Sequence, residues 1–186
     1  VVPVYKTSDS LIELAKIVDN TFIDMPNCNY ELIFVNDSPF WKKTSQTLEH
    51  LTSKYNNIIV VELMKNFGQQ SATMCGIEIS KGDYIITMDD DLQHAPEDIK
   101  KLIQMQEHDV VIARFKLKKH SFFKQKASNI KGYFDHIILN KPKNIKLTPF
   151  RLFNSIVAKA MLKRKTPYPF IPALLFSVTN DIVNVD

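Results

Sequence analysis

The chain has 186 residues, of which 45% are hydrophobic and 24% are charged, so it can bury one sizeable core, and a disordered or fibrous protein is excluded. We therefore expect a single domain over residues 1–186. The net charge of +4 hides an asymmetry, because residues 1–110 hold 9 Lys and Arg against 17 Asp and Glu, whereas residues 111–180 hold 15 Lys and Arg and one acid, Asp135.

The first 113 residues alternate between strand and helix patterns. Short apolar runs predict five strands, at residues 1–5, 32–35, 58–63, 84–88 and 110–113. Helical spacing predicts helices between them. The first is opened by a capping box of Ser10 and Glu13, Ser38-Pro39 starts either a turn or the second helix, and the others start near Gln69 and Pro96. This order predicts an α/β fold with a mostly parallel sheet and helices on both faces. Such sheets bind ligands at the carboxyl ends of their strands.

The pattern weakens after Arg114, where we expect a helix over about 121–139 and a return to the sheet at residues 150–153. The basic half predicts an anionic partner, although a solvated basic face is the simpler alternative. Aromatic residues among the lysines favour an anionic membrane surface, bound weakly. The residues of this predicted membrane contact are Lys116, Lys118, Lys119, Lys124, Lys126, Phe122 and Phe123.

The ends of the chain bear on its location. The chain starts on strand-like residues rather than on methionine, from which we expect a piece trimmed at both ends. It has no signal segment, and no stretch approaches the ~20 apolar residues of a membrane helix. We expect it at the cytoplasmic face of a membrane, either peripheral or anchored through segments outside this sequence. Whether the chain forms a homo-oligomer is left as an open alternative.

The four glycines exclude two phosphate-binding devices. Neither G-x-G-x-x-G nor G-x-x-x-x-G-K-[ST] occurs in the sequence, so no glycine-rich loop can cradle phosphates with its backbone N–H groups. If the chain binds a nucleoside diphosphate, a bound cation is the obvious substitute.

Three consecutive carboxylates follow the predicted strand at 84–88. An extended backbone alternates sides, which would place Asp89 and Asp91 together and Asp90 opposite. Two carboxylates on one side would form part of a site for Mg²⁺ or Mn²⁺ with positions left open for diphosphate oxygens. The alternative is that these residues form a turn or cap a helix. Asp37, at the end of the second strand, would contact a base or ribose, or form an Asx turn.

Several motifs together resemble those of family 2 glycosyltransferases, in the branch with dolichyl-phosphate mannosyltransferase and bacterial polyprenyl-phosphate sugar transferases. The resemblance covers nearly the whole chain. Its most specific part is Asn-Phe-Gly-Gln followed by Asp-x-Asp-Leu-Gln. The motifs occur in the order Val1-Val2-Pro3-Val4-Tyr5, Phe34-Val35-Asn36-Asp37, Lys65-Asn66-Phe67-Gly68-Gln69, Gly82-Asp83, Met88-Asp89-Asp90-Asp91-Leu92-Gln93 and Phe150-Arg151-Leu152.

The resemblance implies a GT-A fold, an inverting transfer from a nucleotide-diphosphate sugar, and Mg²⁺ or Mn²⁺ held by Asp89 and Asp91 with help from Gln93. It implies catalytic roles for Asp91, for Arg114 near the diphosphate or acceptor phosphate, and for Arg151 on the acceptor side. It further implies nucleotide-sugar contacts from Pro3, Val4, Tyr5, Asp37, Asn66, Gly68, Asp89 and Asp90.

Departures from the family pattern keep alternatives open. Lys6-Thr7 stands where the family usually has Asn-Glu, and Thr148-Pro149 stands where some members carry an acid. The chain could therefore be a catalytically silent module that binds a nucleotide sugar or lipid phosphate. A nucleotidyltransferase would want a glycine-rich first loop, and no nucleic-acid motif accompanies the basic residues.

The shortage of acids on the basic side bears on the acceptor. A sugar hydroxyl needs a general base, whereas a lipid phosphate is already an anion at pH 7 and needs only cations to hold it. Residues 111–180 offer one acid, with His120 and His136 as other possible bases. We therefore expect a polyprenyl phosphate acceptor, in cell-envelope glycan synthesis, rather than a sugar hydroxyl.

Overall fold

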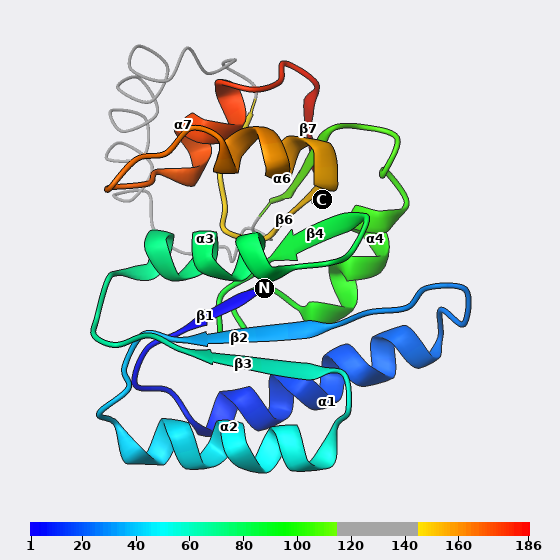
Figure 1. The fold of residues 1–186 in the computed structure, drawn as a ribbon. Helices are drawn as coiled ribbons and strands as arrows, with labels where there is room; N and C mark the ends of the chain where they lie inside the picture. The colour runs from blue at the N-terminus through cyan, green and yellow to red at the C-terminus, as the bar shows by residue number, and fades with distance from the viewer. Residues whose placement is uncertain (115–144) are drawn as a thin grey trace, which may run out of the picture.

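A parallel sheet forms the first half of the fold. In the computed structural model, which describes residues 1–114 and 145–186, strands β1 (Val2–Val4), β2 (Leu32–Asn36) and β3 (Ile58–Glu62) pair in the order β1-β2-β3 (Figure 1). The register places Val2 opposite Phe34 and Leu32 opposite Ile58. All five residues of β2 are buried, as expected for a central strand with both faces covered.

A second sheet continues the first beyond β1. Its order is β4-β6-β5-β7, formed by β4 (Tyr84–Thr87), β5 (Val110–Ala113), β6 (Arg151–Asn154) and β7 (Ile182–Val185). β6 runs antiparallel to both neighbours, which confirms the predicted return to the sheet. The nitrogen of Val1 donates to the carbonyl of Ile86 (2.7 Å) and the nitrogen of Met88 donates to that of Val1 (3.2 Å). The start of β1 therefore lies beside the end of β4.

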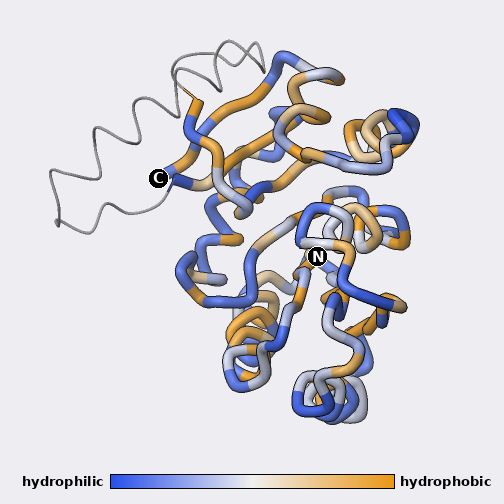
Figure 2. The backbone as a smooth tube through the Cα atoms, turned by 90° about the vertical axis from the view of Figure 1, so that its left-hand side faces the viewer, coloured by the Kyte–Doolittle hydropathy of each residue, from blue (hydrophilic) through white to orange (hydrophobic). Residues whose placement is uncertain are grey.

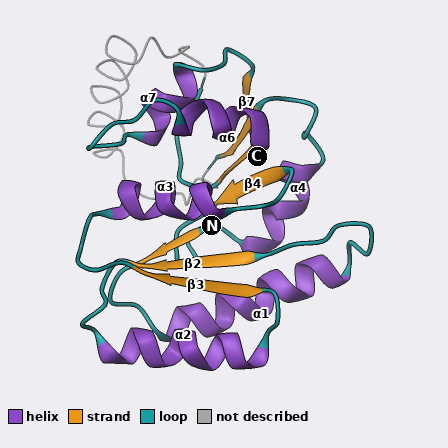
Figure 3. Cartoon of the chain, in the orientation of Figure 1, coloured by secondary structure: helices purple, strands orange, loops and turns teal. Residues whose placement is uncertain are grey.

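Helices cover both faces of the strands (Figure 3). Helices α1 (Asp9–Ile23), α2 (Lys42–Lys54) and α4 (Ile99–Ile103), the last preceded by a 3₁₀ turn at Pro96–Asp98, contribute to one apolar core. Helices α3 (Gln69–Ile79), α6 (Ser155–Leu162) and α7 (Ile171–Phe176) lie on the other face. The helices mix hydrophobic and hydrophilic residues, as is typical of helices with one buried face (Figure 2).

The close approach of α3 to the parallel sheet requires a glycine. A Cβ atom added at Gly76 would lie 2.4 Å from Cγ1 of Val1 and 3.1 Å from Cγ2 of Val35, well inside ordinary van der Waals contact. Because Gly76 has no side chain, the first strands and α3 can pack directly against each other. The N-terminal end of α3 is thereby held beside the carboxyl ends of the strands.

One predicted helix start is wrong, and at another the alternative of a turn is confirmed. α1 begins at Asp9 with Ser8 as its N-cap, so Ser10 lies inside the helix and caps nothing. Its hydroxyl donates instead to the backbone carbonyl of Asp90 (2.7 Å). Ser38-Pro39 starts the turn rather than the helix, because the nitrogen of Trp41 donates to the carbonyl of Ser38, and α2 begins at Lys42.

Two further predictions concern the basic half. The helix expected over about 121–139, and the membrane contact expected at residues 116–126, lie outside the described residues. Within the part of the chain that is described, none of the helices has the length and apolar character needed to span a bilayer.

Candidate active site

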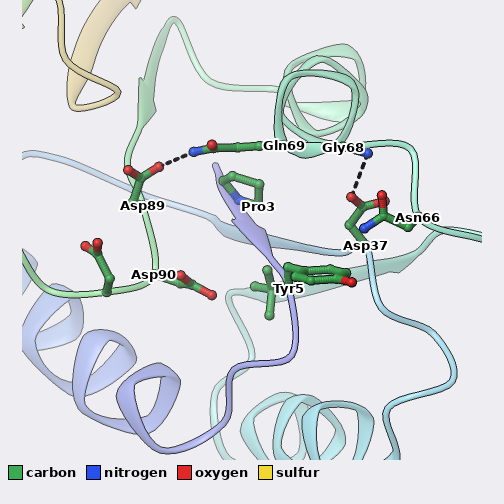
Figure 4. A pocket seen from close by; sticks show the side chains of 10 residues that line it. Pro3, Tyr5, Asp37, Asn66, Gly68, Gln69, Asp89 and Asp90 are labelled. Atoms are coloured by element: carbon green, nitrogen blue, oxygen red, sulfur yellow. Dashed lines mark hydrogen bonds between the residues drawn. The ribbon is translucent and has the colours of Figure 1, made fainter.

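A pocket opens where β1, β2 and β4 end, at the carboxyl edge predicted for ligand binding (Figure 4). Its volume is about 360 Å³. Gln69, which sequence reasoning left without a role, lines it together with nine of the predicted site residues. The lining residues are Pro3, Val4, Tyr5, Asp37, Asn66, Gly68, Gln69, Asp89, Asp90 and Asp91.

Asp89 is held from the side of α3. The side-chain amide of Gln69, the first residue of α3, donates to Oδ1 of Asp89 (2.5 Å) (Figure 4). Burial, followed by the charges of Asp91 and Asp90, raises the pKa of Asp89 to about 6, while Arg151 and the Gln69 amide oppose the rise. A cation that enters the pocket would therefore stabilise the ionised form of Asp89.

Asp90 and Asp91 do not follow the alternation predicted for them. β4 ends at Thr87 and the chain bends at Asp90 and Asp91, after which Leu92 adopts a left-handed φ of 57°. Because the backbone is no longer extended, all three carboxylates line one pocket instead of facing opposite ways. The prediction that Asp90 turns away from the site is therefore wrong.

The environments of these two carboxylates differ. Asp90 points toward the end of β1 (Figure 4), where burial raises its pKa while hydrogen bonds with Thr7 and with the backbone of Tyr5 oppose the rise. Its Oδ2 atom is buried and has no hydrogen-bond partner within residues 1–114 and 145–186. Asp91 is exposed, and its Oδ1 accepts from the backbone nitrogen of Gln93 (3.0 Å). Asp91 is thus the most accessible of the three.

Asp37 clamps the loop between β3 and α3. Its Oδ1 accepts from the backbone nitrogen of Phe67 (2.6 Å) and its Oδ2 from that of Gly68 (2.8 Å), while only 2% of Asp37 is exposed. Gly68 has a φ of 88°, in the region that favours glycine. The predicted Asx turn belongs to the preceding residue, because Oδ1 of Asn36 accepts from the nitrogen of Ser38 (3.0 Å). Asp37 therefore shapes the pocket wall formed by Asn66 and Gly68.

A cation lies among aromatic rings at the end of β1. The ammonium of Lys6 lies 5.1 Å from the ring centroid of Tyr5 and 5.5 Å from that of Trp41, within the range of a cation–π interaction. Lys6 has a φ of 56°, and its backbone nitrogen donates to the hydroxyl of Ser38 (2.9 Å). The departure of Lys6 from the family pattern thus places a positive charge next to Tyr5, a pocket residue.

Arg151 is buried near enough to Asp89 to interact with its charge. It opens β6, opposite Thr87, and by strand alternation it shares the face of Phe153, which packs in the core with α6 and α7. Only 5% of Arg151 is exposed, and its Nε and Nη1 atoms find no hydrogen-bond partner among the described residues. Burial lowers its pKa to about 10, against the opposing charge of Asp89.

Arg151 and two other predicted residues, Arg114 and Gln93, lie outside the pocket lining. Arg114 follows β5, is exposed, and donates from Nη1 to Oδ1 of Asp186 (3.3 Å). Gln93 is exposed two residues beyond Asp91. The structure therefore brings together the predicted nucleotide-side residues and leaves Arg114 and Gln93 at the periphery.

The donor set suits a hard cation that also binds a ligand. Among residues 1–114 and 145–186, no three His, Cys, Asp or Glu side chains are arranged to hold an ion by themselves. The pocket nevertheless carries carboxylate oxygens, the ligands that Mg²⁺ and Mn²⁺ prefer, and Mg²⁺ is commonly bound by one or two carboxylates with phosphates completing the shell. The residues thus fit an ion that arrives with a diphosphate.

Comparison with known proteins assigns this arrangement to a family. A family model described as Glycosyl transferase family 2 matches residues 1–166. The chain is 32% identical over 187 residues to the undecaprenyl-phosphate 4-deoxy-4-formamido-L-arabinose transferase of Edwardsiella ictaluri, covering all of this chain and 57% of that protein. It is 35% identical over 132 residues to the enzyme of the same name from Aeromonas hydrophila, covering 70% of this chain and 40% of that protein. The chain thus spans about half the length of these relatives.

Solved structures share the fold at low sequence identity. S. aureus TarS 1-349 superposes with a TM-score of 0.59 at 18% identity, covering 99% of this chain and 57% of that one. The mannosyltransferase PcManGT from Pyrobaculum calidifontis, in complex with GDP-Man and Mn²⁺, gives a TM-score of 0.61 at 14% identity, covering 85% of this chain and 44% of that one. The architecture is therefore that of GT-A glycosyltransferases.

Proposed function

We propose that this chain, which belongs to glycosyl transferase family 2, forms the catalytic domain of an inverting enzyme that moves a sugar from a nucleoside diphosphate to a polyprenyl phosphate. The supporting observation is the carboxylate-lined pocket at the carboxyl ends of β1, β2 and β4. The Edwardsiella ictaluri relative, named for transfer to undecaprenyl phosphate, matches the whole chain at 32% identity. The corresponding process is cell-envelope glycan synthesis at the cytoplasmic face of the membrane.

The donor is proposed to lie across the pocket with its base and ribose against the end of β1. Pro3, Val4 and Tyr5 line that side, and Asn66 and Gly68 form the wall that Asp37 holds in place. The diphosphate would then point toward the three carboxylates at the end of β4. Like charges repel, so this orientation requires a cation between them.

Asp89 and Asp91 would hold Mg²⁺ or Mn²⁺, with Gln93 near enough in sequence to assist. When bound, the ion would supply positive charge to the departing nucleoside diphosphate. Gln69 keeps Asp89 oriented toward the pocket through its amide hydrogen bond. Asp91, which is exposed, can rearrange toward an ion without disturbing the core.

The acceptor side is proposed to work through cations without a general base. Residues 145–180 contain no Asp or Glu, whereas a lipid phosphate brings its own negative charge and needs only to be held in line with the sugar. Arg151 has two unpartnered nitrogen atoms among the described residues, and Arg114 lies at the end of β5. These two arginines are our candidates for contacts to phosphate oxygens of donor or acceptor.

A thermal-shift panel tests the donor site. UDP, GDP and dTDP sugars would be offered to the chain with and without Mn²⁺, since a ligand at ~100 times its dissociation constant adds about 2.7 kcal/mol of stability. One nucleotide sugar should stabilise the protein, and more strongly with Mn²⁺. Asp91→Ala should abolish the Mn²⁺-dependent part without lowering the melting temperature of the free protein, whereas Glu49→Ala, on the exposed side of α2, should change neither. No stabilisation by any nucleotide sugar would refute the proposal.

A further inference from the structure

Residues 163–170, between α6 and α7, present basic and aromatic side chains to solvent. We name as the α6–α7 loop surface the exposed residues Lys163, Arg164, Lys165, Tyr168 and Phe170. Tyr168 is 89% exposed and Phe170 is 46% exposed. Tyrosine is usually intermediate in burial, so the ring of Tyr168 is available for a contact outside the chain, and Phe170 adds a partly exposed ring beside it.

The loop is held in shape by its own contacts. The guanidinium of Arg164 donates from Nη2 to the carbonyl of Ser177 (3.1 Å), and the nitrogen of Tyr168 donates to the hydroxyl of Thr166 (3.3 Å). Pro167 and Pro169 flank Tyr168 and fix their own φ angles. The exposure of Tyr168 is therefore a property of a constrained loop.

The α6–α7 loop surface adjoins the wall of the candidate active site. The backbone nitrogen of Ile171, directly after Phe170, donates to Oε1 of Gln70 (3.0 Å). The neighbouring Gln69 lines the pocket and binds Asp89. In Figure 1 the connection between α6 and α7 projects on the same side of the molecule as the carboxyl ends of β2 and β3. A surface that docks here would lie beside the pocket opening.

The charge of this region is of one sign. Between residues 145 and 180 there is no Asp or Glu. Lys159, on the α6 helix that precedes the loop, adds to the basic residues of the loop. Lysine and arginine with an exposed tyrosine form the combination suited to the boundary between lipid headgroups and acyl chains. A protein partner would have to supply acids against every one of these cations, whereas an anionic bilayer supplies negative charge at any register.

We propose that the α6–α7 loop surface binds anionic phospholipid headgroups and inserts Tyr168 at the interface, so that the pocket opens toward the membrane. The functional role of this membrane contact rests on the proposed transfer to a lipid phosphate, but the binding to lipid itself requires no nucleotide. It places membrane contact on a second region, in addition to the one predicted at residues 116–126.

Vesicle co-sedimentation tests the proposal. The chain would be mixed at low and high salt with vesicles of phosphatidylcholine alone or with phosphatidylglycerol. Each basic residue near an anionic surface contributes about a 5-fold gain in partition. Lys163→Glu with Lys165→Glu should therefore weaken binding by at least roughly 25-fold, and Tyr168→Ser should weaken it at constant charge. Arg164 is left intact because it binds Ser177.

The matched control reverses two exposed lysines elsewhere, Lys16→Glu on α1 and Lys54→Glu on α2, with the same change in net charge. The control should keep its vesicle binding. Equal loss in both double variants, undiminished binding after reversal of Lys163 and Lys165, or equal binding to neutral vesicles would each overturn the proposal. A chain that binds vesicles through this loop but is stabilised by no nucleotide sugar would refute the proposed function and leave the membrane surface standing.

Discussion

At the scale of single residues, the candidate site is a balance of charges. Three carboxylates meet at the end of β4, and the guanidinium of Arg151 lies buried close enough to influence Asp89. Neither the negative charge of the carboxylates nor the positive charge of the guanidinium is fully compensated among the described residues, because Asp90 and Arg151 each keep buried polar atoms without a hydrogen-bond partner there. Unpaired buried charge costs free energy, and ligand binding is the usual way in which a functional site recovers it.

The raised pKa of Asp89, about 6, predicts a pH dependence of cation binding. A carboxylate must lose its proton to bind a metal ion, so Mn²⁺-dependent binding of the nucleotide sugar should rise about ten-fold from pH 5 to pH 7. The free protein should show the opposite trend. Its folded state binds the proton more tightly than the unfolded chain, whose pKa is about 3.9, so stability falls as pH rises from about 4 to 6. Titration calorimetry across this range checks the first trend and urea unfolding the second.

Asp89→Asn cannot ionise and should remove both pH trends, whereas Asp24→Asn, an exposed carboxylate paired with Lys100, should keep them. Binding that is flat with pH in the unaltered chain would show that Asp89 is already ionised or does not touch the ion.

Arg151 should show opposite effects on stability and on binding. Among the described residues, the buried guanidinium of Arg151 has two nitrogen atoms without a hydrogen-bond partner. Replacing it by an apolar side chain of similar length removes a desolvation cost, so Arg151→Met should leave the free energy of unfolding unchanged or raise it by about 1 kcal/mol. Ligand-induced stabilisation should fall by at least about 1.4 kcal/mol, a ten-fold loss of affinity. Urea unfolding with and without nucleotide sugar or inorganic phosphate measures both quantities.

Arg151→Lys should restore part of the binding, since it keeps the charge without the planar fork. Arg164→Met, at an exposed arginine, should leave nucleotide binding unaltered. If Arg151→Met unfolds the chain without affecting ligand affinity, Arg151 is a structural residue and its assignment to the site is wrong.

At the scale of elements, the strands were predictable and the connections were not. Apolar runs at 32–35 and 110–113 mark strands buried on both faces, and they were correctly located. The Ser10–Glu13 pattern misled because a serine followed three residues later by glutamate does not reveal whether the hydroxyl caps its own helix or reaches a distant segment. Here it reaches Asp90.

The candidate site was also predictable only in part from the sequence. Sequence motifs predicted nine of the residues that line the pocket, because the carboxyl ends of parallel strands converge. They did not reveal the clamp of Asp37 on Phe67 and Gly68, or the burial of Arg151. Both depend on which strands become neighbours, and adjacency in the sheet cannot be read from local periodicity.

The packing of α3 predicts the effect of a small substitution. Gly76→Ala places a methyl group within 2.4 Å of Val1 and 3.1 Å of Val35, so α3 must shift away from the sheet. Overpacking of this kind costs about 1–3 kcal/mol, and the displaced Gln69 should weaken nucleotide binding as well. Glu78→Ala, on the exposed side of the same helix, serves as the control and should be nearly neutral. Denaturant unfolding that finds Gly76→Ala as stable as the unaltered chain would refute the close packing.

At the scale of the whole molecule, the distribution of charge separates two tasks. The acidic half contributes β1–β4 and the carboxylates of the pocket, and the basic half contributes β6, α6 and α7. The acidic half suits a nucleotide-sugar donor that binds together with a cation, and the basic half suits an anionic acceptor. The two halves meet where β4 pairs with β6, at Thr87 and Arg151.

This division predicts the acceptor. An enzyme that contains this chain, which spans 57% of the Edwardsiella ictaluri relative, should transfer sugar to undecaprenyl or dolichyl phosphate and not to a soluble sugar acceptor. The reason is that residues 111–180 hold 15 Lys and Arg and one acid, Asp135, so this half of the chain favours a bound anion over a hydroxyl nucleophile that needs a carboxylate base. Both acceptors would be offered side by side with the donor identified by thermal shift. Efficient transfer to the hydroxyl alone would contradict the prediction.

The pairing of β5 with β6 has a consequence for how such enzymes can diversify. The nitrogen of Ala113 donates to the carbonyl of Phe150 (3.0 Å), and the hydroxyl of Thr148 donates to the carbonyl of Ala113 (2.7 Å). The two ends of the connection between these strands are therefore fixed side by side, whatever its length. Doubling the length of a connection closed in this way costs only about 0.6 kcal/mol of chain entropy. A connection of another length or sequence can therefore replace this one while β5 and β6 keep their pairing.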